Sequence, residues 1–214
     1  MTEPEARIPE RGRSLFGNDK GDMHVPGAGT MGMALLLVSL GMLFAASVLG
    51  YLMIRFGKFA GQAWPPAGYP SLPWSLWIST GVILATSITI QWALVAARRG
   101  NLAALGRALA ITLGLGLLFL GLQGFNWLEI WTSLSPEQRH HGGPYIMLFY
   151  VLTGLHAAHV IGGLIPLVVV TRRAMAVGGA RYSANYHPGV RYCAMYWHFL
   201  DAVWVALFTI LCLV

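Results

Sequence analysis

An aspartate and a histidine lie inside an apolar stretch that runs to the last residue, Val214. His198 and Asp201 are three residues apart, so on a helix they share a face, and each can bond to the other or to a neighbouring helix. A charged side chain in hydrocarbon costs about 3 kcal/mol on insertion scales, so an acid here indicates a role in function or assembly. The chemistry open to the pair is proton transfer, metal ligation or a buried hydrogen bond.

A second polar patch precedes the first and contains Thr153, His156 and His159. At 100° per residue these three residues and Gly163 fall within about 120° of the circumference of a helix. Imidazole is a common metal ligand, so one interpretation is a haem or metal site. The other interpretation is a hydrogen-bonding stripe that fixes helix packing.

Counting possible ligands separates these two interpretations. A haem held by two imidazoles needs a histidine on each of two facing helices, and copper or zinc needs three or four ligands. Only three histidines, at 156, 159 and 198, lie well inside apolar stretches. One such site is conceivable, but an oxidase core with two haems and a copper is not. We expect no metal or cofactor on this chain and a structural polar network in the membrane, made by Thr153, His156, His159, His198 and Asp201.

A proton-relay role for Asp201 would need further titratable groups along a path. Segments 30–54, 74–97 and 108–128 contain no Asp, Glu, Lys, Arg or His. The same absence argues against a transporter, which needs a polar path through several spans. We therefore expect the aspartate to fix helix packing.

Aromatic residues surround the aspartate. Trp197 and Trp204 share a helical stripe with Asp201, which is typical either of aromatic packing at a helix crossing or of a ridge that contacts lipid or another subunit. With Tyr196, they are our candidates for lipid or subunit contact.

Small residues recur at helical spacing in two stretches. They include Ala110, Gly114, Gly121, Gly124, Gly154, Ala158 and Gly162. Small residues at this spacing let helix backbones approach closely in lipid, which predicts close packing against a partner helix.

The elements that position these residues follow from composition. The chain is 56% hydrophobic and 10% charged, with a mean hydropathy of +0.61, whereas soluble domains carry about 25% charged residues. Five apolar stretches have about the 20 residues needed to cross a bilayer. They are 30–54, 74–97, 108–128, 144–171 and 192–214. We predict an all-α membrane protein in which 29–214 form a five-helix transmembrane domain after a flexible cytoplasmic tail, 1–28.

Basic residues indicate the orientation of these helices. Of the 14 Lys and Arg residues, 11 fall on one side of the predicted spans and three, Arg55, Lys58 and Arg139, on the other. Because cytoplasmic loops carry the excess of Lys and Arg, this split predicts a cytoplasmic N-terminus and a periplasmic C-terminus. The net charge of +6 therefore reflects topology and does not indicate a nucleic-acid partner.

The two polar patches together form a pattern. Phe149-Tyr150-x-x-Thr153-Gly154-x-His156-x-x-His159-Val160 is followed by Tyr196-Trp197-His198-Phe199-x-Asp201-x-x-Trp204. This pattern resembles subunit III of the haem–copper cytochrome and quinol oxidases. The resemblance covers roughly 143–214 well and matches the third span more loosely, through Thr112, Gly114, Phe119 and Gln123. Members of this family have seven or five spans, and this chain resembles the short form.

Three departures from the family pattern stand in this sequence. The Ser-Glu pair that the family has in the corresponding span reads Ser39-Leu40, so a role that depends on that carboxylate is not available. The acid after the Gln of the third span is replaced by Asn126. The usual His-Gly-x-His reads His156-Ala157-Ala158-His159.

The resemblance implies a non-catalytic subunit in a bacterial cytoplasmic membrane. It would stabilise the catalytic subunit I, meet subunit II and small subunits, and hold phospholipid between its helices. Haem and copper would then lie in the partner subunits. Two alternatives remain open: an accessory subunit of a nitric oxide reductase-type complex, and a membrane protein that binds haem or metal through His156, His159 and His198. The residues do not distinguish cytochrome c from quinol as electron donor.

Overall fold

The computed structural model describes residues 28–62, 64, 66, 68–70, 72–141, 143–176 and 188–213. These residues form six α-helices and one π-helical segment, without any strand in the ranges just given. The elements are α1 (Ala28–Met53), η1 (Ile54–Lys58), α2 (Ser75–Arg98), α3 (Leu102–Ser133), α4 (Pro136–His141), α5 (Pro144–Met175) and α6 (Pro188–Leu213). Five helices are long and apolar enough to cross a membrane: α1 with η1, α2, α3, α5 and α6. The predicted all-α, five-span class is confirmed.

Helices extend beyond the apolar stretches that identify them. The third stretch was expected at 108–128, but α3 runs from Leu102 to Ser133 and includes Arg107 and Glu129. At its start the Asn101 side chain accepts a hydrogen bond from the Ala104 amide, 3.0 Å away, and so caps the helix. Hydropathy therefore identifies the apolar part of α3, whereas its first turn is fixed by the Asn101 cap. The predicted tail lies outside the described residues except for Ala28, which begins α1.

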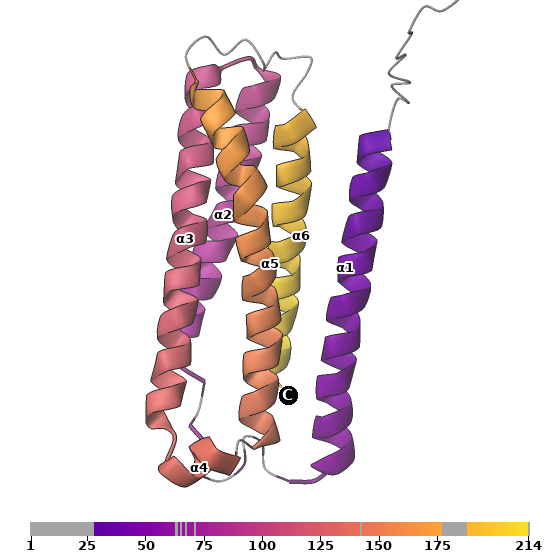
Figure 1. Cartoon of the computed structure of the whole chain (residues 1–214), viewed down its shortest axis with the longest axis vertical. Coiled ribbons are helices and arrows are strands. Elements are labelled where there is room, and N and C mark those ends of the chain that lie inside the picture. The colour runs from indigo at the N-terminus through magenta and orange to yellow at the C-terminus, as the bar shows by residue number, and fades with distance from the viewer. Residues whose placement is uncertain are drawn as a thin grey trace, which may run out of the picture.

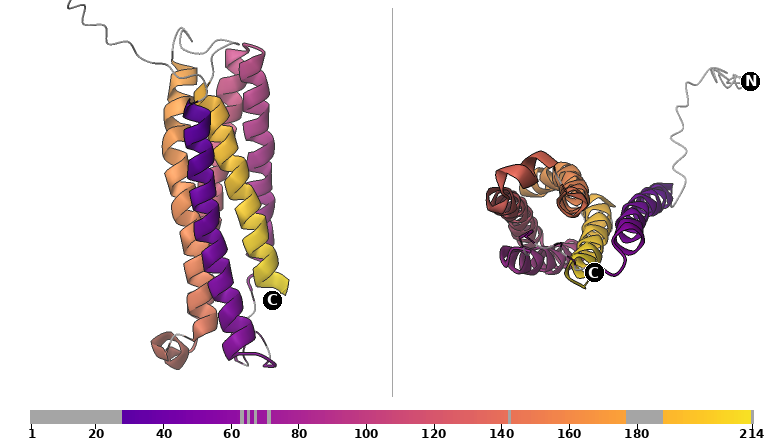
Figure 2. Two further views of the ribbon diagram at one scale, coloured as in Figure 1. Left: turned by 90° about the vertical axis from the view of Figure 1, so that its right-hand side faces the viewer. Right: turned by 90° about the horizontal axis from the view of Figure 1, so that it is seen from below.

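Four helices form a bundle and the fifth lies beside it. Helices α2, α3, α5 and α6 surround a common interior, and α1 stands outside next to α5 and α6 (Figures 1 and 2). In the apolar 18-residue segment of the first span only 6% of the residues are buried, against 33–44% in the corresponding segments of the other four spans. The interior that positions the polar residues is therefore built by four helices.

Close helix contacts occur at three glycines, which are Gly29 against Tyr192, Gly116 and Gly163. A Cβ atom added at Gly163 would lie 2.6 Å from Cε1 of Tyr196, and one at Gly116 would lie 2.8 Å from Cη2 of Trp197. These rings occupy space that any larger side chain would need. The small-residue stripes predicted to pack closely do not do so within this chain. A Cβ at Gly114, Gly121 or Gly124 would meet nothing within 4 Å, and one at Gly154 or Gly162 would make only ordinary contact.

Replacing Gly163 with alanine is expected to destabilise the bundle. The new methyl group meets the ring of Tyr196, whose hydroxyl is held by a 2.9 Å hydrogen bond to the carbonyl of His159. Such overpacking typically costs about 1–3 kcal/mol, against about 1 kcal/mol gained from helix propensity. Gly114→Ala, where the space is open, is the control and should be neutral or stabilising. Unfolding of the purified subunit in SDS, followed by circular dichroism, measures both. Equal stability of the two variants would contradict the close contact.

The orientation in the membrane stays a prediction. The loop after η1 and helix α4 lie at one end of the bundle, where the Gln138 side chain donates to the carbonyl of Gly68 at 2.8 Å. The turn between α2 and α3 lies at the other end (Figure 1). In a cysteine-free variant, cysteines introduced at Gln62 and Gln138 should react with a membrane-impermeant thiol reagent from the periplasmic side. A cysteine at exposed Ala103 should not, and the reverse pattern would invert the topology.

Candidate functional site between the membrane helices

Asp201 joins α6 to α2 in the interior. Its side chain is 3% exposed. It accepts hydrogen bonds from the hydroxyls of Ser87 and Thr86, the latter at 3.2 Å. Thr86 also lies 2.6 Å from the carbonyl of Ile83. The carboxylate thus bonds to hydroxyls of another helix, as expected of an acid that fixes helix packing.

His198 meets Asp201 through Ser87 rather than directly. Its Nδ1 lies 3.1 Å from the Ser87 oxygen, and its Nε2 lies 3.3 Å from the Oε1 of Gln91. Sequence reasoning identified the histidine and the aspartate but not their bridge. The Thr86-Ser87 pair was the available signal, but it is one of several hydroxyl-bearing sites in this span, and nothing in the sequence says which helix it faces.

His156 does not belong to a hydrogen-bonded network. Its side chain is 0% exposed, and neither ring nitrogen has a hydrogen-bond partner. The imidazole lies between aromatic rings: Trp204 at 5.0 Å, Phe119 at 5.7 Å and Phe44 at 6.2 Å between centroids. The expectation of one polar network was therefore wrong at this residue. Spacing placed the histidine on the correct face but could not reveal that the face meets rings.

The remaining members of the predicted network point to separate neighbours. Thr153 accepts from the indole of Trp127 at 3.1 Å and donates to the carbonyl of Phe149. The Nδ1 of His159 lies 2.7 Å from the carbonyl of Leu155, and its ring packs against Phe44 of α1. Among the described residues, no group of three or more His, Cys, Asp or Glu side chains could hold a metal ion. The polar residues of α5 and those of α6 thus contact different helices: Thr153 meets α3 and His159 meets α1, whereas His198 and Asp201 meet α2.

Both tryptophans of the last span are interior residues. Trp197 and Trp204 are each 1% exposed. The indole of Trp204 donates to Thr80 at 3.1 Å, and its ring packs edge-on against Phe119 at 4.9 Å. Trp204 is covered by α2 and α3, so the expected contact of this residue with lipid or another subunit was wrong. Tyr196 is half-buried and does reach an outer groove. Trp197 packs against Gly116 of α3 but also lines the same outer groove as Tyr196.

Polar residues of α3 differ in their surroundings. Asn126 contacts Ser75 and donates to Ser79 at 3.2 Å, so it ties α3 to α2. Gln123 is 1% exposed, and neither atom of its amide group has a partner. The side chain that replaces the family's acid thus bonds between helices.

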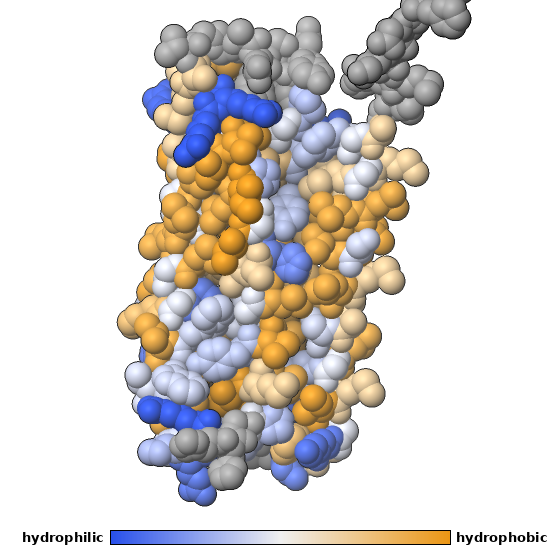
Figure 3. Space-filling model, in the orientation of Figure 1, coloured by the Kyte–Doolittle hydropathy of each residue, from blue (hydrophilic) through white to orange (hydrophobic). Residues whose placement is uncertain are grey.

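A groove separates α1 from α5 and α6. Its volume is about 640 Å³, and its walls include Leu36 and Leu40 of α1, Pro166 and Arg173 of α5, and Tyr192 of α6. Figure 3 shows apolar side chains over the facing sides of α1 and α5, with hydrophilic ones at the C-terminal end of α5, where Arg172 and Arg173 lie. The groove is therefore apolar along its length and basic at one end.

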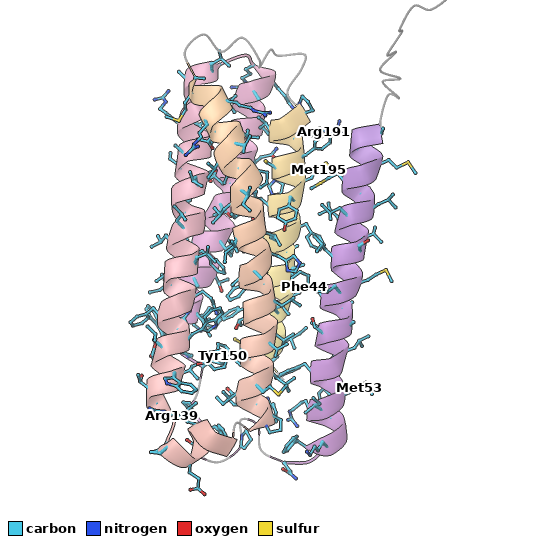
Figure 4. The ribbon with its side chains drawn as sticks, in the orientation of Figure 1. Phe44, Met53, Arg139, Tyr150, Arg191 and Met195 are labelled. Carbon is cyan, nitrogen blue, oxygen red and sulfur yellow. The ribbon has the colours of Figure 1, made fainter. Side chains whose placement is uncertain are left out.

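Phe44 lies on α1 one helical turn beyond Leu40, on the side of the groove toward η1. It points from α1 into the bundle, whereas Met53 points away and is 74% exposed (Figure 4). Its ring lies 5.1 Å from that of His159 and 6.5 Å from that of Phe199. Beyond it, the Trp64 indole donates to Tyr51 at 3.1 Å and packs edge-on against Tyr145. These aromatic contacts anchor the second half of α1 to the bundle.

Comparisons with known proteins identify the fold. The model of the family described as "Cytochrome c oxidase subunit III" matches residues 17–213. The chain is 30% identical over 181 residues to "Cytochrome c oxidase subunit 3" of Thermostichus vulcanus, covering 85% of each chain. It is 32% identical over 178 residues to the protein of that name from Synechocystis sp., covering 83% of this chain and 72% of the relative. Against that of Loxodonta africana the identity is 37% over 150 residues, 69% of this chain and 54% of the relative.

Proposed function

The chain belongs to the cytochrome c oxidase subunit III family, and we propose that it is the non-catalytic subunit that stabilises subunit I of its haem–copper oxidase. The bonding of Asp201 carries this proposal. The acid is occupied by hydroxyls of α2, a contact that holds helices together. Haem and copper then belong to partner subunits, among which we propose subunits I and II.

The histidines support the same proposal. His156 is enclosed by aromatic rings, His159 is turned to a backbone carbonyl, and His198 is bonded to α2. Such divergent surroundings do not suit a shared ligand set, which disfavours the haem- or metal-binding alternative. The relatives reported above are cytochrome c oxidase subunits and give no support to a nitric oxide reductase partner. We propose cytochrome c as donor and the cytoplasmic membrane of a bacterium as location.

Co-purification tests this function. A tagged chain, extracted in a mild detergent, should bring down further polypeptides together with a Soret band. The subunit separated from them should lack that band. A Soret band in the separated subunit that disappears in His156→Phe would overturn the proposal, as would a tagged chain that recovers no haem protein from native membranes.

We propose further that a phospholipid occupies the groove between α1 and α5. Leu36, Leu40 and Pro166 offer an apolar surface to an acyl chain. Pro166 has no amide hydrogen and so makes no helical hydrogen bond to the carbonyl of Gly162, a residue that also lines the groove. Arg173 at the basic end suits a phosphate group, on the side predicted to be cytoplasmic. Leu40 stands where the family has glutamate, so this groove lacks that carboxylate.

Removing the charge at the basic end should release this lipid. Arg173→Gln is expected to lower the phospholipid retained by the purified complex by about one molecule per chain, because the phosphate loses its ionic partner. Arg172→Gln is the matched control, since it makes the same charge change on the adjacent exposed residue, which does not line the groove. Phosphorus analysis and mass spectrometry of extracted lipids measure the difference. Equal lipid content in the two variants would remove the headgroup role of Arg173.

A further inference from the structure

An amide lies on the outer surface of α2, well inside the membrane. The side chain of Gln91 is exposed. It precedes Arg98, the last residue of α2, by seven residues, which is about 10 Å at 1.5 Å per residue. A glutamine side chain cannot reach the interface over that distance in a hydrocarbon core of about 30 Å. The other exposed positions of α2 before Arg98 are Trp77, Ile78, Gly81, Leu84, Ile88 and Trp92. Gln91 is thus the one amide on an otherwise apolar face.

The hydrogen bonds behind this amide fix which groups it can use. Ser87 has one hydroxyl hydrogen, and Asp201 accepts it. The Ser87 oxygen therefore accepts from Nδ1 of His198 at 3.1 Å, so Nδ1 carries a hydrogen. Nε2 of the same ring meets Gln91 at 3.3 Å. A neutral imidazole with its hydrogen on Nδ1 accepts at Nε2 from the amide NH2 group, whereas an imidazolium donates from Nε2 to the amide oxygen. In either case the other group of the Gln91 amide has no partner among the described residues of this chain.

The surface of α6 beside this amide carries small side chains. Ala202 and Ala206 are exposed on α6, one helical turn apart and following His198. Because α2 and α6 bond through Gln91–His198 and Thr80–Trp204, these alanines lie along the same outer face as Leu84 and Ile88. Small residues let another helix come close enough for side chains to form hydrogen bonds in lipid. An acyl chain offers neither donor nor acceptor, so lipid alone would leave the amide unsatisfied.

We infer that the α2–α6 face around Gln91 and His198 is an intramembrane interface, covered by a transmembrane helix of another polypeptide that presents a hydrogen-bonding side chain to Gln91. The inference rests on the proposed function, since it assigns that helix to another subunit of the oxidase. It goes beyond that function by naming the surface and the chemistry of the contact. The buried Asp201 and the surface amide then form one continuous chain of polar contacts that links the core of this subunit to its neighbour.

Photo-crosslinking in native membranes tests the inference without depending on purification. A photoreactive phenylalanine analogue at Ile88, which is 72% exposed, should form an adduct with a second polypeptide, identified by mass spectrometry as a subunit of the oxidase. Adding Gln91→Leu should lower the adduct yield several-fold, because the partner loses its hydrogen bond. Adding Ile161→Ala, a change at an exposed residue of α5 outside this face, should leave the yield unchanged.

The outcomes separate the inference from the proposed function. An adduct with phospholipid only, or with a second copy of this chain, overturns the inference even where the chain co-purifies with a haem protein. If the adduct yield is the same with and without Gln91→Leu, the role of the amide is overturned. An adduct with a polypeptide that belongs to no haem–copper oxidase, and that is lost in Gln91→Leu, supports the interface and overturns the proposed function.

Discussion

Trp204→Ala is expected to destabilise the bundle by about 3–5 kcal/mol, the usual cost of removing a buried aromatic side chain. The indole is 1% exposed and packs against Phe119 and His156 at centroid distances of 4.9 and 5.0 Å. Its removal leaves a void in the middle of four helices, and the Thr80 oxygen loses the indole donor while its hydroxyl still donates to the carbonyl of Leu76. Unfolding of the purified subunit in SDS, followed by circular dichroism, should show the loss.

Two controls define what the Trp204 result means. Trp204→Phe keeps most of the ring volume but loses the hydrogen bond to Thr80, so a smaller loss of about 0.5–1.5 kcal/mol is expected. Trp74→Ala removes an indole that is 73% exposed and should leave the stability almost unchanged. If Trp204→Ala proved as stable as Trp74→Ala, the packing described for the interior would be incorrect.

Asp201→Leu should separate α6 from α2. Leucine has a similar size but accepts no hydrogen bonds, so Ser87 loses its acceptor and Thr86 one of two, at about 1–3 kcal/mol for each group left unsatisfied. We expect lower recovery of this subunit with its complex. The turnover of the remaining catalytic core should stay close to normal in its first cycles. Co-purification measures the recovery of the subunit, and initial turnover on the same preparations measures the activity of the catalytic core.

Asp201→Asn distinguishes packing from proton transfer. An amide oxygen still accepts from Ser87 and Thr86, so most of the contact and of the assembly should be retained. A fully assembled Asp201→Asn complex that has lost its initial activity would mean that the carboxylate carries protons. The packing role would then be wrong.

The number of membrane-spanning helices and the all-α class could be predicted because hydropathy and charge act along the sequence. A charge-free stretch such as 74–97 has to leave water whatever surrounds it, and it became α2. The presence of an acid in the last span also predicted a partner for Asp201. Its identity could not be predicted, because Ser87 lies more than a hundred residues earlier, and only the packing of α2 against α6 brings the two together.

The neighbour that each stripe meets could not be predicted, because it depends on which way each helix faces. Gly154 and Gly162 share a stripe with suitable spacing, yet the close approach to α6 occurs at Gly163, next to it. His156 and His159 are three residues apart, but one lies among aromatic rings in the interior and the other faces α1. A rotation of α5 by one residue position would exchange such roles. Spacing within one helix defines stripes but not the neighbour that each stripe meets.

The bond between Asp201 and α2 bears on the order in which the chain is made. The ribosome completes α2 long before it reaches α6, so the hydroxyls of Thr86 and Ser87 are in the membrane when the acidic segment emerges. A helix with a central aspartate partitions poorly into lipid by itself. Hydrogen bonds to the hydroxyls of α2 would favour the transfer of this helix from the translocon into the membrane. We therefore expect the insertion of α6 to depend on contact with α2, which is already in the membrane, as well as on partition into the bilayer.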